Sequence, residues 1–337
     1  MNIHILFEFK SGPWGGGNQF LKGLKNQLIK LGTYEETFRE ADVILFNSHH
    51  NLKQVLELKR KHQNKILIHR IDGPILKIRN GDLGIDKIIY QFNKFFADGT
   101  IFQSNWSKKE NYKLGMERNR FEAVILNAPD NSIFNKRDKS PFKKNQKVKL
   151  IATSWSDNWK KGFETYKYLD ENLDFRKYEM TFIGNSPIGF RNIRWIKPLS
   201  SKGVAKQLKK HDIFITASQK DPCSNSLIEA LHCGLPAIVL NDGGHPEIVK
   251  NGGEIFNGEK DILGKINKVA QNYKRYQKAI DLPSMEKIAK EYYQFAQKIF
   301  NDYQKKTYIP KKINLLQQGE IALLMLYQKI KNKRPYL

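Results

Sequence analysis

The sequence predicts an α/β protein built from two doubly wound domains, each a parallel sheet flanked by helices. Short apolar runs typical of buried strands alternate with amphipathic helical stretches, which is the rhythm of βαβ units. One segment without periodicity interrupts this alternation, which then starts again. The chain of 337 residues, 40% of them apolar, is too long for one ordinary α/β domain and suits two domains of about 150 residues each.

The first half begins with an apolar run at 3–9, IHILFEF, and a helix expected over about 19–31. Further strands are expected at 43–46, 66–69, 100–103 and 123–126, with helices at 51–62, 84–95 and 106–114. Strands that alternate with helices in this way form a parallel sheet. We assign residues 1–135 to an N-terminal Rossmann-like domain.

A stretch rich in Pro, Asn and Lys, 127–147, has no helical or strand periodicity and marks the domain boundary. We assign 136–147 to a linker. Strands are then expected at 148–155, 180–184 and 212–218, with helices at about 162–172 and 202–210. These elements and those that follow form a second Rossmann-like domain over 148–285. Pro283 precedes a further amphipathic helix, which Ser284 is expected to cap.

The composition narrows the cellular setting. The net charge of +24 suggests an anionic partner, such as a nucleotide, a nucleic acid, a phosphorylated polymer or an acidic membrane face, although an AT-rich genome would give a similar excess of lysine. The two cysteines, Cys223 and Cys233, lie beside one helix and indicate a reducing cytoplasm. The N-terminal run has the features of a strand and not of a signal peptide, and no apolar run reaches the roughly 20 residues that a bilayer requires.

The segment DPCSNSLIEALHCGLPAIVLNDGG, which starts at Asp221, carries the clearest sign of chemistry. Ser224 and Asn225 can accept hydrogen bonds from free backbone N–H groups, and apolar residues at helical spacing follow, so a helix is expected to begin there. A glycine ends this helix, and a buried strand is expected at 237–240. The helix N-terminus, with the backbone of Ser224 to Ser226, is suited to an anion.

Two carboxylates stand eight positions apart in this segment, Asp221 and Glu229. Ionised carboxylates repel phosphate but accept hydrogen bonds from hydroxyl groups, so beside an anion site they suit a sugar nucleotide. The structural alternatives are a turn residue before Pro222 for Asp221 and a solvated helix charge for Glu229. We favour the functional interpretation of both residues. For Glu229 the reason is that it lies among apolar residues, where a solvated charge is unfavourable.

Two loops add candidates. Gly15, Gly16 and Gly17 follow the first expected strand and would let the backbone approach a phosphate or sugar, although the loop matches neither a dinucleotide fingerprint nor a P-loop. Lys160 and Lys161 follow the first strand of the second domain, where a lysine can neutralise a leaving diphosphate. Both loops have structural alternatives, since glycine-rich turns and lysines are common.

Together these motifs make the chain resemble a family 4 glycosyltransferase of the GT-B fold. The family signature in the second domain is E-x7-E, then A-x-x-x-G-x-P, a strand and G-G-x-x-E. The matching residues are Asp221, Glu229, Ala230, Gly234, Pro236, Gly243, Gly244 and Glu247, with Lys161–Gly162 at the family's K-G. The hinge NAPDNSIF at 127–134, the first glycine-rich loop and a C-terminal helix crossing back after Pro283 also agree, so the resemblance covers about residues 1–305. It implies two domains that face a central cleft.

The resemblance implies a role for each donor-side candidate. Glu229 would hold the ribose hydroxyls and Asp221 the hydroxyls of the transferred sugar. Lys161 and the backbone amides of Ser224, Asn225 and Ser226 would bind the diphosphate. Lys160, Gly16 and Gly17 are further donor-binding candidates.

On the N-terminal, acceptor-side domain, His69 in ILIHRIDGP matches the family's histidine that contacts the donor sugar. A satisfied structural histidine is the alternative. Asp72 and Arg70 are candidates for contacting acceptor or sugar. Asp221, Lys161 and His69 are therefore the predicted catalytic residues.

The resemblance implies transfer of a sugar with retention of configuration, from a UDP- or GDP-linked donor, with no cofactor and no obligatory metal. The acceptor would be a glycan or lipid-linked glycan, as in polysaccharide biosynthesis. Two departures open alternatives: Asp221 replaces the usual Glu, and Ser156 stands where the family has a phosphate-binding Arg. A catalytically silent nucleotide-sugar-binding scaffold is one alternative. The other is a transferase that acts on nucleic acid, which the charge suggests, although nucleic acid is not the partner that we favour.

The C-terminal tail is apolar and then basic, IALLMLYQKIKNKRPYL. Such a segment suits docking on the inner face of an anionic membrane by an otherwise cytoplasmic enzyme. The alternative, which we favour from sequence, is that the C-terminal helices, about 290–337, pack on the N-terminal domain.

Overall fold

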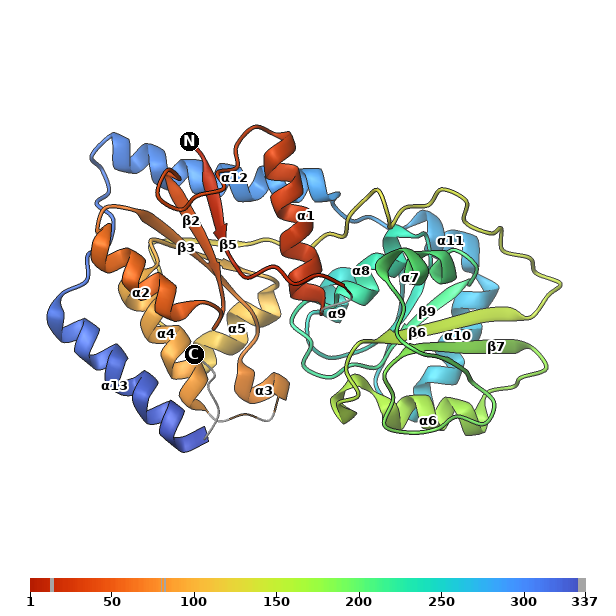
Figure 1. Cartoon of the computed structure of the whole chain (residues 1–337). Coiled ribbons are helices and arrows are strands. Elements are labelled where there is room, and N and C mark those ends of the chain that lie inside the picture. Colours follow the sequence, from red (N-terminus) through yellow and green to blue (C-terminus); the bar gives the residue numbers. More distant parts are fainter. Residues whose placement is uncertain (13–14, 80, 82, 333–337) are drawn as a thin grey trace. The chain divides into compact units, whose positions relative to one another are not determined.

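The computed structural model describes residues 1–12, 15–79, 81 and 83–332, and the chain divides into two compact units (Figure 1). Unit 1 comprises Met1–Phe9, Leu24–Leu126 and Glu286–Leu337, and unit 2 comprises Lys10–Gly23 and Asn127–Met285. Each unit contains one parallel sheet with helices packed against it. The prediction of two Rossmann-like α/β domains is confirmed; their facing across a cleft stays a prediction.

The sheet of unit 1 has five parallel strands in the order β1-β2-β3-β4-β5, which is the order of the chain. Its strands are β1 (Ile3–Leu6), β2 (Val43–Asn47), β3 (Ile66–Ile71), β4 (Gly99–Phe102) and β5 (Phe121–Val124). Its helices are α2 (Leu52–Lys61), α3 (Ile75–Arg79), α4 (Leu83–Phe96), α5 (Asn105–Lys113), α12 (Met285–Gln304) and α13 (Leu315–Asn332), and it shares α1 (Gly16–Lys30) with unit 2. No reversal of strand order occurs among these strands, so the doubly wound order is found in unit 2 only.

The C-terminal helices complete unit 1. A Cβ on Gly99 would lie 2.5 Å from Ile299 Cδ1 of α12, so only glycine in β4 lets this helix lie so close to the sheet. The Asp98 carboxylate then accepts hydrogen bonds from the Tyr308 hydroxyl at 2.6 Å and the Lys311 backbone N–H at 2.8 Å. These contacts hold the chain between α12 and α13 against unit 1.

The sheet of unit 2 has six parallel strands in the order β11-β10-β9-β6-β7-β8. Its strands are β6 (Val148–Ser154), β7 (Tyr178–Gly184), β8 (Arg194–Ile196), β9 (Ile213–Thr216), β10 (Ala237–Leu240) and β11 (Gly253–Phe256). Its helices are η1 (Trp159–Lys161), α6 (Phe163–Asn172), α7 (Ser201–Leu208), α8 (Asn225–His232), α9 (His245–Val249), α10 (Glu259–Gln271) and α11 (Tyr273–Lys278).

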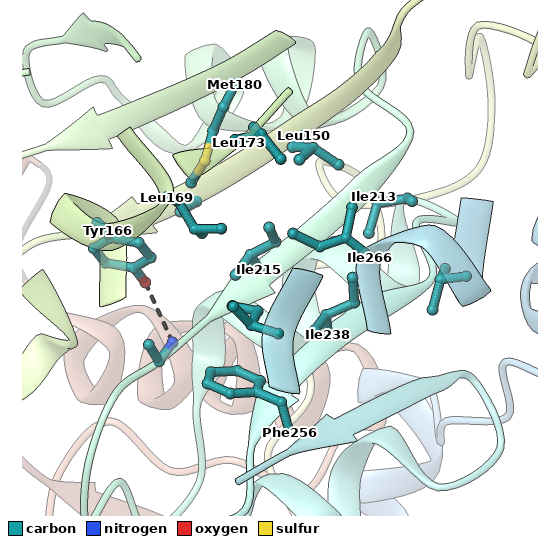
Figure 2. Packing of buried hydrophobic residues seen from close by; sticks show 14 of the residues in the cluster. Leu150, Tyr166, Leu169, Leu173, Met180, Ile213, Ile215, Ile238, Phe256 and Ile266 are labelled. Atoms are coloured by element: carbon teal, nitrogen blue, oxygen red, sulfur yellow. Dashed lines mark hydrogen bonds between the residues drawn. The ribbon is translucent and has the colours of Figure 1, made fainter. Parts of the chain in front are cut away.

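One face of this sheet carries a continuous apolar core. Figure 2 shows Leu169 from α6 and Ile266 from α10 in the same cluster as Ile213, Ile215 and Ile238 of the central strands. All five side chains are fully buried. Closely packed side chains on both helices and strands hold the carboxyl ends of β6 and β9 in fixed positions, which is what a binding site requires.

The predicted domain boundary needs correction. The segment assigned to the end of the first domain and to the linker, 127–147, belongs to unit 2. Phe134 is buried, Lys209 Nζ donates to Asn135 Oδ1 at 3.0 Å, and the Ser140 backbone N–H donates to the Lys209 carbonyl at 2.9 Å. The predicted boundary was wrong because these contacts are made with Lys209, about 70 positions later in the chain. A local sequence pattern does not indicate contacts at that separation.

Candidate functional site

The strand order of unit 2 reverses between β6 and β9, because the chain builds β6-β7-β8 outward on one side and β9-β10-β11 on the other. Open α/β sheets bind ligands outside the carboxyl ends of strands at such a reversal, where successive loops diverge. The loop after β6 carries Lys161 and the loop after β9 carries Asp221. Two predicted catalytic residues are thus brought to this point.

Lys161 is presented by the short helix η1. Asn158 caps this helix by accepting from the Lys160 backbone N–H at 2.9 Å. Gly162 then adopts a left-handed φ of 91°, and a Cβ on it would lie 2.4 Å from the Ala217 Cβ at the end of β9. Glycine is therefore required for the η1 turn to lie against β9. The family's K-G pair is explained here as a lysine with the turn that places it.

Asp221 is held by Lys161 and Ser218. Lys161 Nζ lies 3.2 Å from Asp221 Oδ2 and 3.3 Å from Ser218 Oγ, while the Cys223 backbone N–H donates to Asp221 Oδ1 at 3.3 Å. Burial would raise the pKa of Asp221, but the charge of Lys161 and the hydrogen bonds from Lys161 and Cys223 outweigh it and lower the pKa, so the carboxylate is ionised. The Lys161 side chain is 35% exposed, so its ammonium group is open to a ligand from solvent.

The glycine pair of the signature supports the backbone of Asp221. Gly243 has a φ of 63°, and a Cβ on it would lie 2.3 Å from the Asp221 carbonyl oxygen. The Gly244 backbone N–H donates to this same oxygen at 2.8 Å. The glycines therefore position Asp221, in addition to any contact they make with a ligand.

His245 follows this pair, and the sequence motifs did not single it out. Its imidazole is fully buried, its Nδ1 lies 3.3 Å from the Leu240 carbonyl, and its Nε2 has no hydrogen-bond partner among the described residues. Burial lowers the pKa of His245, opposed in part by Asp221, so the ring is neutral and Nδ1 is the nitrogen that donates to Leu240. A neutral imidazole with an unpaired nitrogen near Asp221 is a further candidate residue of this site.

The N-terminus of α8 lies in the same loop region. Ser224 is buried and its Oγ accepts from the Leu227 backbone N–H at 3.5 Å, which confirms it as the cap. Its Oγ also lies 3.2 Å from Ser226 Oγ. The first turn contains no acidic residue, so the positive end of the helix dipole is not neutralised by its own side chains. The geometry suits an anion, as the sequence predicted.

Asn225 has a structural task. Its Oδ1 accepts from Asn127 Nδ2 at 3.0 Å, and a Cβ on Gly16 would lie 2.2 Å from Asn225 Nδ2. Gly16 is therefore small so that the start of α1 can lie on α8. This contact places the glycine-rich loop in unit 2.

The glycine-rich loop itself is closed by Asn18. The Lys10 backbone N–H donates to Asn18 Oδ1 at 3.0 Å, and Asn18 Nδ2 donates back to the Lys10 carbonyl at 3.1 Å. Gly17 is exposed with open space around it, so a ligand could approach its backbone. Residues 13 and 14 of the predicted loop lie outside the described residues.

Glu229 lies one helical turn along α8. Its carboxyl group has no hydrogen bond or ion pair among the described residues, and burial raises its pKa to about 8. A partly buried carboxyl group without a partner is costly unless it serves a ligand. Hydroxyl groups of a bound molecule would supply the missing donors.

The predicted residues of unit 1 form a separate group at the carboxyl end of β3. Arg70 is buried and donates to Asn47 Oδ1 at 2.5 Å, Asp72 Oδ1 at 3.1 Å and the Tyr292 hydroxyl at 3.1 Å. Its guanidinium is thus committed inside unit 1. Asp72 also accepts from Gln103, yet 27% of its side chain is exposed. Asp72 is available to a ligand and Arg70 positions it.

His69 lies in the interior of unit 1. It is fully buried, stacked on Phe46 with ring centroids 4.0 Å apart, and its Nε2 lies 2.9 Å from the Ser48 carbonyl. Asn93 Nδ2 lies 3.4 Å from its other nitrogen, and burial lowers its pKa to about 3. The structural alternative accounts for His69, and the predicted catalytic role has no exposed atom to support it.

Two other histidines occupy the neighbouring strand end. His49 and His50 follow β2, with ring centroids 4.3 Å apart, and both are partly exposed. Burial and the neighbouring His50 lower the pKa of His49 to about 4, although Asp72 opposes this shift. Their position directly after a strand, in FNSHHN, is a sequence signal for residues of a site at the carboxyl edge of the sheet.

Comparison with known proteins identifies the module that holds the unit 2 site. Residues 190–282 match the family described as Glycosyl transferases group 1. This match lies within unit 2. The match agrees with the resemblance to a glycosyltransferase seen in the motifs, and its range includes Asp221, Glu229 and His245. Lys161, on the loop after β6, lies before that range but in the same unit.

Whole-chain similarity extends to solved structures of the same fold. The chain is similar to sucrose-phosphate synthase from Thermosynechococcus elongatus, with a TM-score of 0.65 and 12% identity over 99% of this chain and 100% of the other. It is also similar to HepE of Anabaena, solved in complex with UDP-glucose, with a TM-score of 0.65 and 15% identity over 90% of this chain and 100% of that one. The two-domain fold of GT-B glycosyltransferases therefore applies to the chain.

A curated relative gives a closer match over a shorter range. A probable sucrose-phosphate synthase of Thermosipho melanesiensis is 27% identical over 163 residues, which is 45% of this chain. The match spans 38% of that relative's own length. The relative's description agrees with the family match of residues 190–282.

Ser156 and Lys160 both belong to the loop after β6. Ser156, where the family has arginine, accepts the Asn158 backbone N–H through its Oγ at 3.1 Å and so shapes the η1 turn. The Lys160 carbonyl accepts from the Gln219 backbone N–H at 2.7 Å, which ties this loop to the loop after β9. Lys160 is half-buried, and its role toward a donor stays a prediction.

Proposed function

We propose that the protein is a retaining glycosyltransferase that moves a sugar from a nucleoside diphosphate sugar to a glycan or lipid-linked glycan. The observation that carries the proposal is the ion pair of Lys161 with Asp221 at the reversal of the unit 2 sheet, where Asp221 lies within the stretch 190–282 that matches Glycosyl transferases group 1. A lysine and a helix N-terminus attract a diphosphate, and the carboxylates beside them attract hydroxyl groups.

The chemistry centres on the departing diphosphate. Breaking the bond between the anomeric carbon and the phosphate oxygen leaves negative charge on the diphosphate, and stabilising that charge is the main catalytic task. Lys161 is partly exposed and forms an ion pair with Asp221. Its ammonium group can therefore contact a phosphate oxygen while it stays close to Asp221. The backbone amides at Ser224 to Ser226 supply further positive potential.

The two carboxylates divide the rest of the donor. Asp221, ionised and fixed by the Gly243–Gly244 turn, would accept from hydroxyls of the transferred sugar. Glu229, without a partner, would accept from the ribose hydroxyls. Because the cation that faces the diphosphate is a lysine, we propose that transfer proceeds without an obligatory metal, and full activity in excess EDTA is the expected result.

For the acceptor side we propose Asp72, assisted by the neighbouring His49 and His50. Asp72 is the exposed carboxylate of the β3 end, and the histidines stand at the adjacent β2 end. The attacking hydroxyl group of the acceptor substrate must be oriented by groups that accept a hydrogen bond from it, and these side chains can do so. HepE, which has a similar fold, was solved in complex with UDP-glucose. This complex supports a nucleoside diphosphate sugar as the donor.

The test begins with a thermal shift screen of UDP-, GDP- and ADP-sugars, since a ligand that binds the folded state raises its melting temperature. The best donor is then assayed for release of free nucleotide with Lys161→Ala and Glu229→Ala. We expect Lys161→Ala to lower kcat by about 100-fold or more, as for loss of one charge-stabilising group. Glu229→Ala should mainly weaken donor binding.

Lys265→Ala is the matched control. Lys265 is also a partly exposed lysine in an ion pair, with its Nζ 3.1 Å from Glu254 Oε2. This pair joins α10 to β11 and does not belong to the loops after β6 and β9. Its loss should leave turnover unchanged. Unchanged turnover in Lys161→Ala would contradict the site, whereas donor binding without any turnover in the wild-type protein would favour the silent scaffold.

A further inference from the structure

Helix α13 exposes an unusual amount of apolar surface. Six of the twelve large apolar side chains that are exposed in the described part of the chain belong to this helix of 18 residues. They are Leu315 (82% exposed), Leu316 (85%), Leu323 (68%), Leu326 (54%), Tyr327 (64%) and Ile330 (69%). Single exposed apolar residues are ordinary, but a group on one helix marks an interaction site.

The exposed side chains share one face of the helix. At 3.6 residues per turn, these six residues together with Gly319 and Ala322 cover an arc of about 140°. The opposite face carries Ile321 (1% exposed) and Met325 (7%), which join the core of unit 1 with α2 and α4. Figure 1 shows α13 lying along α4. The helix is therefore held in place by one face while the other is left apolar and uncovered.

The charge near this face indicates what covers it. Lys329 and Lys331, both exposed, stand at its two borders toward the end of the helix, and Glu320, the acidic residue of α13, lies on the same border as Lys331 but nearer the start of the helix. Lys312, also exposed, precedes the helix. An apolar face bordered by lysines is the pattern of a helix that lies in the interface of an anionic bilayer.

A second copy of the chain fits less well. Pairing α13 with itself would bring together two molecules that each carry a net charge of +24. Like charges oppose such an association, whereas anionic phospholipids attract the same surface. The structure contains no described helix with the length and apolar character needed to cross a membrane, so attachment would be peripheral.

We propose that the exposed face of α13 docks the protein on an anionic phospholipid membrane, with the helix parallel to the surface and its apolar side chains among the lipid tails. The inference stands on the surface of unit 1 and is independent of the activity proposed for unit 2.

The test is flotation of the full chain with vesicles of phosphatidylcholine alone or with about one third phosphatidylglycerol. The wild-type protein should bind the anionic vesicles and bind the neutral ones far less. Leu323→Ser with Ile330→Ser should lower the partition coefficient about ten-fold or more, because both apolar side chains leave the lipid. Lys329→Gln with Lys331→Gln should lower binding to the anionic vesicles about ten-fold and leave the weak binding to neutral ones unchanged.

Ile29→Ser with Leu31→Ser is the matched control. These residues are also exposed apolar side chains of unit 1, at 48% and 36%, but they lie at the end of α1 and after it. Their variant should bind like the wild type. The four positions changed to serine are all exposed, so the melting temperatures of both serine variants should equal that of the wild type. Equal vesicle binding by Leu323→Ser/Ile330→Ser and wild type would overturn the proposal, as would a dimer in sedimentation that this double variant separates.

Discussion

The carboxyl group of Glu229 sits in surroundings that oppose its ionisation. Burial raises its pKa in the folded protein to about 8, above the ordinary value of 4.5, and no partner offsets this. Between those two pH values the folded state keeps a proton that the unfolded state has lost. Stability is therefore expected to fall as pH rises through this window and to stay low above it.

Replacing Glu229 by Gln should remove this dependence. Relative to Glu229→Gln, the wild-type free energy of unfolding should fall by roughly 1–4 kcal/mol between about pH 5 and about pH 9. Urea titrations at several pH values measure it. Exposed Glu171 on α6 provides the control, since Glu171→Gln should keep the wild-type profile. Parallel profiles for wild type and Glu229→Gln would contradict the assignment.

The same substitution should weaken donor binding above about pH 8, where the wild-type carboxyl group is ionised, because an amide accepts fewer hydrogen bonds from ribose than a carboxylate does. A residue that destabilises the fold at neutral pH while aiding binding is typical of functional sites. Stability and affinity are therefore expected to move in opposite directions in one variant.

At the scale of elements, the turn from η1 to α6 depends on Gly162. Gly162→Ala places a side chain at a left-handed φ of 91° and 2.4 Å from Ala217. We expect the free energy of unfolding to fall by about 2 kcal/mol or more, and donor turnover to fall with it, because Lys161 would be displaced. Chemical denaturation and the nucleotide-release assay measure the two effects.

Gly264→Ala is the contrasting variant. Gly264 lies inside α10, and a Cβ on it would meet no atom within 4 Å. Alanine there should raise stability by about 1 kcal/mol, since glycine is a poor helix former. A similar loss in both variants would show that backbone strain at Gly162 is not the cause.

The sequence predicted those elements whose pattern is local. β6, β7 and β10 appear within two residues of their expected bounds, because buried β-branched runs are recognisable alone. β8 and β11 were not predicted: β8 is exposed or half-buried along its length, and β11 begins with glycine and contains Glu254. Short strands at the edges of a sheet lack the continuous apolar run that announces a central strand.

The site divides in the same way. The meeting of Lys161 with Asp221 was predictable from motif spacing and strand ends. The interior place of His69 was not, because the buried partners Phe46 and Asn93 lie on other elements. His245 likewise looked like an ordinary residue after a glycine pair, since its unpaired nitrogen is visible only in three dimensions.

At the scale of the whole molecule, each unit has its own core, so the two should unfold in separate transitions. A bound nucleotide sugar is expected to raise one midpoint, that of unit 2. Gly99→Ala should lower the other, because it pushes α12 from the unit 1 sheet. Differential scanning calorimetry resolves the two peaks. A single transition that moves as a whole in both experiments would contradict independent cores.

The division of unit 1 into three stretches of chain also sets an order of events at the ribosome. Its sheet is made before residues 127–285 of unit 2, yet residues that complete its core, Tyr292 beside Arg70 and Ile321 beside α4, belong to the stretch Glu286–Leu337, which is made after them. Unit 2 can complete its core in the meantime. The growing chain therefore carries an unfinished apolar sheet while unit 2 is made, and unit 1, whose sheet is made earlier, matures after unit 2.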